Sequence, residues 1–202
     1  PFVAPQRHWD LYRDADIPPP RVAPIPYDEL DEHSRWLHVA HAQDLYSVSP
    51  AQVQRARRAY YGMVSYVDEK IGRVLDVLHE TGLADDTVVV FAGDHGEMLG
   101  ERGMWFKQCF FEDSARVPLV VSAPGRFAPR RVAAAVSLVD LLPTLLDLAT
   151  DGQPPDWVAP IDGQSLLPLV TGADDGVDRC VVAEYSSEGV CAASRMVRQG
   201  RW

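Results

Sequence analysis

An apolar run leads directly into a carboxylate and an imidazole at Thr87-Val88-Val89-Val90-Phe91-Ala92-Gly93-Asp94-His95-Gly96. Such a run of β-branched and aromatic residues is typical of a strand buried on both faces. Ligands of open α/β sheets bind beyond the carboxyl ends of strands, which is where Asp94 and His95 would lie. Glycines on both sides permit a turn and a close approach of the backbone. The two side chains are therefore candidates for binding a divalent cation.

A long helix is expected before this strand. Ser49 suits the N-cap and Pro50 the first helical position, while Gly82 is a suitable residue for the end. Apolar side chains recur between them at steps of three and four, as in an amphipathic helix: Tyr60, Val64, Val67, Ile71, Val74, Leu75 and Leu78. A helix, a short loop and a buried strand in this order predict an α/β fold.

The remaining segments give weaker signals. Residues 1–48 are rich in proline and aromatic residues, which predicts an irregular but ordered excursion packed on a larger body. Residues 117–121 predict a second strand, and residues 179–185 and 194–202 two more. Residues 137–149 predict a helix that either kinks at its internal proline or begins near Asp140. Residues 151–160 predict a loop.

Composition limits the classes of function. The 202 residues carry a net charge of -10, which argues against a nucleic-acid partner because such binding relies on Lys and Arg. No run of 18 apolar residues is present, so we expect no membrane span. The three cysteines form no CxxC pair, which favours free thiols in a reducing, cytoplasmic compartment. The sequence begins at Pro1, so a signal peptide upstream stays an open alternative.

Asp-His-Gly alone is a weak signal, because a tripeptide is easily matched by chance. On that evidence Asp94 could equally be a turn-capping residue and His95 a surface histidine.

The longer strings resemble the type I sulfatases of the alkaline phosphatase superfamily, and within them the choline sulfatases. The similar strings are residues 93–107, 110–119 and 137–145. The resemblance implies an alkaline phosphatase-like α/β fold, in which this chain contributes part of a mixed central sheet flanked by helices. Residues 1–150 would form the second half of the catalytic domain, with an excursion at 1–48 and a helix–strand–helix core at 49–150. Residues 151–202 would start the C-terminal region, and we expect the N-terminal part of the domain to be missing.

The resemblance also implies roles for individual residues. Asp94 and His95 would be metal ligands, completed by acidic residues outside this chain. Calcium and magnesium prefer shells made of oxygen ligands, whereas imidazole suits transition metals better, so His95 leaves the identity of the ion open. We favour calcium, with manganese or magnesium as alternatives. Lys107 would contact the sulfate and stabilise charge on the leaving oxygen. A solvated lysine is the alternative for Lys107.

The resemblance to choline sulfatases implies a small-molecule sulfate ester as the substrate, choline O-sulfate, which is hydrolysed to choline and sulfate. A quaternary ammonium requires a carboxylate and aromatic faces. Glu184 would meet the ammonium, and Tyr185 and Trp105 are candidate walls. The alternative for Glu184 is an exposed acid at the end of a strand. The alternative for Tyr185 and Trp105 is that both are core residues.

Sulfatases of this type use a formylglycine made from a Cys/Ser-x-Pro-x-Arg motif. None of the three cysteines has the proline and arginine at the required offsets. We therefore expect the nucleophile outside this segment, the segment alone to be inactive, and the enzyme to be a homo-oligomer. A phosphonate monoester or phosphodiester hydrolase of the same superfamily is the rival enzyme, and an inactive binding module is the rival from another class.

Overall fold

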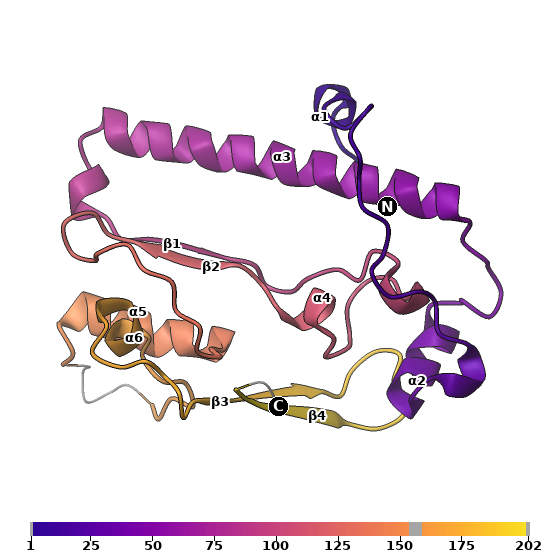
Figure 1. Ribbon diagram of the computed structural model, residues 1–202. Helices are drawn as coiled ribbons and strands as arrows, with labels where there is room; N and C mark the ends of the chain where they lie inside the picture. The colour runs from indigo at the N-terminus through magenta and orange to yellow at the C-terminus, as the bar shows by residue number, and fades with distance from the viewer. Residues whose placement is uncertain (1, 154–158, 201–202) are drawn as a thin grey trace. The chain divides into compact units, whose positions relative to one another are not determined.

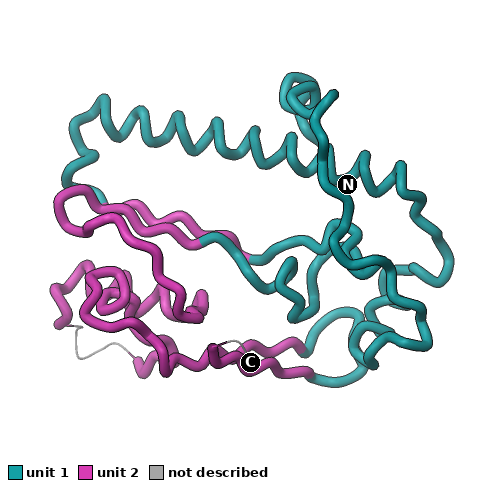
Figure 2. The backbone as a smooth tube through the Cα atoms, in the orientation of Figure 1, with its two compact units in different colours: residues 1–87, 95–118, 186–193 teal, residues 88–94, 119–185, 194–202 magenta. Residues whose placement is uncertain are grey.

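The computed structural model describes residues 2–153 and 159–200 of the chain. These fall into two compact units (Figure 2). Unit 1 contains residues 1–87, 95–118 and 186–193, and unit 2 contains residues 88–94, 119–185 and 194–202. The elements in chain order are α1 Gln6–Asp10, η1 Tyr27–Glu29, α2 Glu32–Ala40, α3 Pro50–Glu80, η2 Ala84–Asp86, β1 Val89–Ala92, η3 Glu101–Gly103, α4 Glu112–Ala115, β2 Leu119–Ser122, η4 Leu138–Asp140, α5 Leu141–Thr150, α6 Leu167–Thr171, β3 Cys180–Tyr185 and β4 Ser194–Gln199.

The predicted long helix is α3, drawn as the longest ribbon of Figure 1. The Ser49 hydroxyl accepts a hydrogen bond from the Gln52 backbone N–H, and the Gln52 side chain accepts one from the Ser49 backbone N–H. This capping box satisfies donors that the first helical turn leaves open, with Pro50 at the first position. The helix ends at Glu80, and Gly82 follows with a positive φ of 71°. The sequence prediction is confirmed at both ends.

The N-terminal excursion packs on α3, as expected. The Tyr12 hydroxyl lies 2.6 Å from the Ser65 hydroxyl, and the rings of Phe2 and Tyr60 meet edge to face at 5.4 Å. The expectation of irregular structure is only partly correct, because α1 and the nine-residue α2 interrupt the excursion. The Asp31 carboxylate caps α2 by accepting from the Ser34 backbone N–H at 3.0 Å. Helix formation is allowed there because the proline-rich stretch has already ended.

The core of unit 1 joins α2 to the loop that follows β1. Leu37 of α2 is fully buried against Met98, Met104 and Cys109, and Phe111 and Val190 pack around this cluster. Burial of a leucine side chain contributes about 2 kcal/mol. Helix α2 is therefore a support for the 97–109 loop.

Unit 2 contains two antiparallel strand pairs, β1 with β2 and β3 with β4, visible in Figure 1. The register of the first pair runs from Val89 opposite Ser122 to Ala92 opposite Leu119. The prediction that β1 is buried on both faces is wrong for the described chain, since Phe91 is 39% exposed and Val120 is 55% exposed. The apolar run correctly indicated a strand, but a pair of strands leaves a face uncovered by other strands of the described chain.

The helix predicted at 137–149 begins near Asp140, which is one of the two alternatives given above. The short η4 ends at Asp140 and α5 starts at Leu141, which puts the proline within the first turn. Asp140 is buried and accepts hydrogen bonds from the backbones of Ser137 and Gln164 and from Arg179 at 2.6 Å. These contacts give the carboxylate a structural role. Residues 154–158 of the loop predicted at 151–160 lie outside the described residues.

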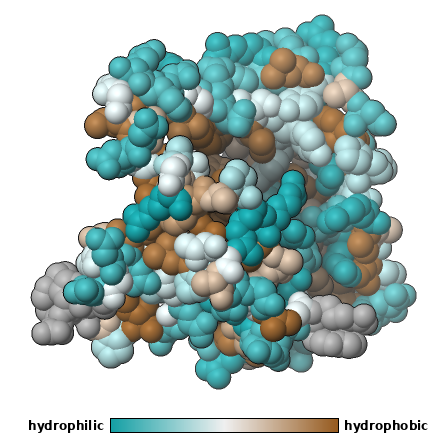
Figure 3. All heavy atoms as spheres, turned by 60° about the vertical axis from the view of Figure 1, so that its left-hand side comes forward, coloured by the Kyte–Doolittle hydropathy of each residue, from teal (hydrophilic) through white to brown (hydrophobic). Residues whose placement is uncertain are grey.

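The surface of the chain is mixed in polarity. Hydrophobic atoms lie among hydrophilic ones over the face drawn in Figure 3. Helix α3 exposes several valines, namely Val64, Val67, Val74 and Val77. Among the described residues, no helix combines the length and the apolar character that a bilayer crossing demands.

Candidate active site at the end of β1

The backbone turns sharply just after β1, where Asp94 and His95 lie exposed. Asp94 belongs to unit 2 and His95 to unit 1, and the peptide bond joins them. The Gly96 N–H donates to the Ser114 carbonyl at 2.7 Å. A Cβ on Gly96 would lie 2.9 Å from the Asp113 carbonyl carbon and closer still to its oxygen. The sequence expectation of a close backbone approach is thus confirmed at Gly96.

The structure brings Lys107 to His95. The Lys107 Nζ lies 2.7 Å from His95 Nε2, and His95 Nδ1 lies 2.8 Å from the Gly96 carbonyl oxygen. A carbonyl oxygen can only accept, so Nδ1 carries the imidazole proton and Nε2 keeps its lone pair. The ammonium donates to that lone pair. An ammonium and an imidazole from positions twelve residues apart therefore meet at the end of β1.

The loop that carries Lys107 has an unusual backbone. Phe106 and Gln108, on either side of the lysine, have φ values of 68° and 78°. A residue with a side chain adopts this left-handed conformation at a cost of roughly 1–2 kcal/mol. The Phe106 N–H donates to the Glu97 carboxylate at 2.6 Å, and the Phe106 carbonyl accepts from the Met98 N–H at 2.8 Å. These contacts hold the loop against its strain.

Two histidines of the α2 segment also hold this loop. His33 Nε2 lies 2.7 Å from the Gln108 carbonyl oxygen, and His41 Nε2 lies 2.7 Å from the Gln108 side-chain oxygen. Neither histidine is among the candidate residues of the sequence analysis. Their spacing of eight residues, with the buried Leu37 midway, marks one face of a helix and was the signal available.

The predicted ammonium ligand Glu184 lies in β3, within unit 2. It pairs across the sheet with Arg195 of β4, with 2.7 Å between Oε1 and Nε, and its side chain is 60% exposed. Tyr185 ends the same strand and is partly buried. An exposed ion pair of this kind contributes about 0–1 kcal/mol, so Arg195 would release the carboxylate at little cost.

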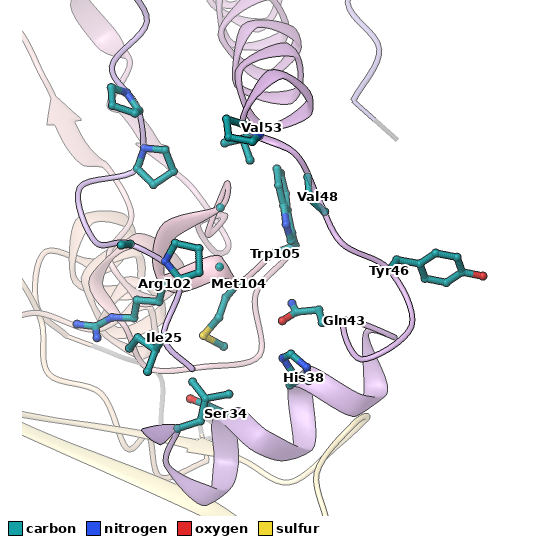
Figure 4. Close-up of a pocket in the computed structure, with 18 of the residues that line it drawn as sticks. Ile25, Ser34, His38, Gln43, Tyr46, Val48, Val53, Arg102, Met104 and Trp105 are labelled. Atoms are coloured by element: carbon teal, nitrogen blue, oxygen red, sulfur yellow. The ribbon is translucent and has the colours of Figure 1, made fainter. Parts of the chain in front are cut away.

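Trp105 lines a cavity of about 410 Å³ in unit 1, shown in Figure 4. The walls are mostly prolines and aliphatic side chains, and Tyr46 points away from the hollow in that view. Among the described lining residues Arg102 carries the formal charge, and none is a carboxylate. The cavity therefore suits an apolar group, and Trp105 as a wall for the ammonium stays a prediction.

Within the described chain, two residues at this position can serve as metal ligands. Asp94 offers carboxylate oxygens and His95 the unprotonated Nε2, both of which are good ligands for a divalent cation. No group of three or more His, Cys, Asp and Glu residues in residues 2–153 and 159–200 is arranged to hold an ion. The residues present therefore fit part of a metal shell, and an ion on Nε2 would displace the Lys107 ammonium from it.

Comparison with known proteins identifies the family. The family model described as Sulfatase matches residues 10–151. The chain belongs to the sulfatase family. It is 44% identical over its whole length to the choline-sulfatase of Rhizobium meliloti (strain 1021) and covers 39% of that protein. It is 36% identical to arylsulfatase K of Gallus gallus, over 75% of this chain and 29% of that protein.

A solved structure agrees with this assignment. The phosphonate monoester hydrolase SpPMH of Silicibacter pomeroyi superposes with a TM-score of 0.81 at 30% identity, over all of this chain and 44% of that one. The predicted alkaline phosphatase-like α/β fold is thereby confirmed for this sulfatase chain, which spans about two-fifths of the length of these relatives.

The chain contains one match to the nucleophile motif, contrary to the expectation that the motif lies wholly outside it. Ser122-Ala123-Pro124-Gly125-Arg126 has the serine form of Cys/Ser-x-Pro-x-Arg. Ser122 ends β2 opposite Val89, whereas Asp94 follows the other end of β1. Three steps along the ladder separate those ends by about 10 Å. The match is therefore too far from Asp94 to supply a nucleophile there.

Proposed function

We propose that this sulfatase hydrolyses a sulfate ester, choline O-sulfate, to choline and sulfate. The contact that carries the proposal is the 2.7 Å approach of Lys107 to His95, because it brings an ammonium to an imidazole whose neighbour in the sequence is the carboxylate Asp94. The 44% identity to the choline-sulfatase of Rhizobium meliloti supports the choice of ester.

Asp94 and His95 would hold one divalent cation, with calcium favoured over manganese and magnesium. When bound, such a cation supplies positive charge to the oxygens of the sulfuryl group. The protonated Nδ1 of His95, bound to the Gly96 carbonyl, keeps Nε2 turned outward as a ligand. Lys107 would leave His95 for the ester and stabilise charge on the departing oxygen. Asp94→Ala in the full natural polypeptide should lower the bound metal per chain.

The nucleophile would come from outside residues 1–202. The cysteines lack the motif, and the serine match at Ser122 lies at the wrong end of the β1–β2 ladder. A hydrated formylglycine elsewhere in the natural polypeptide would supply the nucleophilic hydroxyl that takes the sulfuryl group as the alcohol leaves, and the 202-residue segment alone would be inactive. Cytoplasmic location, homo-oligomeric assembly and the division of the domain near residue 150 stay predictions.

Glu184 would bind the trimethylammonium group of the substrate, with Tyr185 and Trp105 as aromatic walls. The carboxylate is exposed and its partner Arg195 is itself exposed, so a substrate cation can compete for it. An ammonium without N–H groups gains from charge and aromatic faces alone.

Two variants of this strand pair test the choice of substrate. Glu184→Gln in the full natural polypeptide should raise KM for choline sulfate at least about tenfold, as expected when an ion pair worth about 1.4 kcal/mol is lost. The KM for an aryl sulfate whose aryl group is uncharged should change less than about twofold. Arg195→Gln is the matched control, because it breaks the same pair but keeps the carboxylate, so KM for choline sulfate should not rise. If Glu184→Gln changed KM equally for both esters, Glu184 would not be the residue that binds the trimethylammonium group.

A phosphonate monoester hydrolase is the second candidate, favoured by the superposition on SpPMH. Rates on matched phenyl sulfate and phenyl phosphonate esters distinguish the two enzymes. A kcat/KM that is higher for the phosphonate would replace the sulfatase proposal, and binding of either ester without turnover would favour the inactive module.

A further inference from the structure

Helix α2 presents one face to the loop that carries Lys107. His33, Leu37 and His41 lie at intervals of four residues and therefore share that face. The middle residue is fully buried in the core of unit 1. The two histidines lie on either side of it, and both reach Gln108, the residue after Lys107. The helix thus packs on the loop and hydrogen-bonds to it on the same face.

The direction of these hydrogen bonds follows from the acceptors. The Gln108 main-chain oxygen cannot donate, so His33 must carry a proton on Nε2. The same holds for His41 toward the Gln108 side-chain oxygen at 2.7 Å. The other ring nitrogen of His41, Nδ1, is buried without a hydrogen-bond partner among the described residues. Such a group is uncommon in proteins, and its presence calls for an explanation.

Ring contacts also join the two histidines to Phe106 and Phe110 of this loop. The His41 ring meets the Phe106 ring edge to face, with centroids 4.9 Å apart, and the His33 ring stacks on Phe110 at 6.0 Å. Phe106 and Gln108, which flank the lysine, both have positive φ. Strained backbone persists only where the surroundings determine it, and it concentrates at functional sites. The histidines contact the strained residues on both sides of the lysine.

We propose that His33 and His41 are positioning residues that hold the strained segment 106–108 and thereby deliver the Lys107 ammonium to the site beside His95. The proposal rests on the role of Lys107 in the proposed function. His33 and His41 both hydrogen-bond to Gln108, the residue after the lysine. They act through Gln108 and Phe106, so their removal should weaken the contribution of Lys107 and little else.

The dependence of rate on the leaving group separates this role from a structural one. Poor leaving groups need the ammonium most, because more charge develops on the departing oxygen. In the full natural polypeptide, His41→Ala should lower kcat about tenfold for unsubstituted phenyl sulfate and less than about twofold for 4-nitrophenyl sulfate, since small misplacements of a catalytic group have large effects. The KM values should stay within about twofold. His41→Gln keeps an N–H donor near the Nε2 position and should restore most of the rate.

Three further variants complete the experiment. Lys107→Ala should show the same dependence on the leaving group, and adding His41→Ala to it should cost no further rate. Gln108→Gly removes the acceptor of His41 while tolerating positive φ, so it should reproduce the effect even if His41→Ala does not fold. His79→Ala is the matched control, because His79 bonds only to the Leu75 carbonyl of its own helix among the hydrogen bonds described.

The outcomes are distinct. Equal losses on both aryl sulfates in His41→Ala and Gln108→Gly, with the normal dependence in Lys107→Ala, would overturn the positioning role alone. Equal losses in Lys107→Ala would overturn the role of the lysine in the proposed function, and the positioning role with it.

Discussion

Gly96 is the position where one methyl group should do the most harm. A Cβ there would lie 2.9 Å from the Asp113 carbonyl carbon and 3.2 Å from the Ser114 carbonyl oxygen. Non-bonded carbon atoms prefer about 3.5–4.0 Å, so Gly96→Ala requires the 113–114 backbone to withdraw by about 1 Å. The obstacle is backbone, which cannot rotate aside as a flexible side chain would.

The size of the effect follows from what the shift breaks. The Gly96 and Glu97 N–H groups donate to the Ser114 and Asp113 carbonyls at 2.7 and 2.8 Å. Each hydrogen bond is worth about 1 kcal/mol, and overpacking adds about 1–3 kcal/mol. We expect the free energy of unfolding to fall by about 3–5 kcal/mol. His95 is the neighbouring residue, so a 1 Å displacement should lower kcat/KM about 100-fold.

A second glycine supplies the control. Gly72 lies inside α3 with open space where a Cβ would lie, so Gly72→Ala should raise the free energy of unfolding by about 0.5–1 kcal/mol. Urea unfolding and sulfate-ester kinetics of both variants, in the full natural polypeptide, test the reasoning. A Gly96→Ala protein with unchanged stability and kcat/KM would refute the close approach.

Three other outcomes are expected. Hydrogen bonds from Lys70 and His8 hold the pKa of Glu69 at about 2, below its usual 4.5, so the stability difference between wild type and Glu69→Gln should be complete above pH 4.5 and should vanish as the pH falls to 2 in urea titrations. Burial raises the pKa of the Cys109 thiol, so iodoacetamide should label the two exposed cysteines first and Cys109 only on unfolding, as peptide mass spectrometry would report. Asp140→Asn leaves Arg179 without its buried partner and should cost about 3–5 kcal/mol of stability in thermal melts.

The sequence was most informative where the determinants are local. The capping box at Ser49 and the apolar period fix α3 without reference to the rest of the chain. The apolar runs likewise predicted β1 and β2, because strand propensity is read from a few consecutive residues. Burial was misjudged at Phe91, because it depends on which elements cover a face, and no local pattern encodes that.

The residues of the candidate site were predictable from the sequence, but the residues that hold its loop in place were not. Asp94, His95 and Lys107 lie in one short string. The partners of Gln108 lie 67 and 75 residues away along the chain, and a glutamine with positive φ carries no sequence signal. The motif match at Ser122 is the opposite case, because a clear sequence pattern lies at the wrong end of the β1–β2 ladder. A sequence motif alone does not tell where its residues lie in a sheet.

The β1–β2 ladder has a practical consequence for anyone who would produce these residues as a separate polypeptide. Each of the two strands has one backbone edge that no other described strand covers, and Val120 displays an apolar side chain to solvent. Open edges beside apolar side chains are templates on which further chains add by hydrogen bonding. Expressed in isolation, the segment should accumulate as insoluble aggregates.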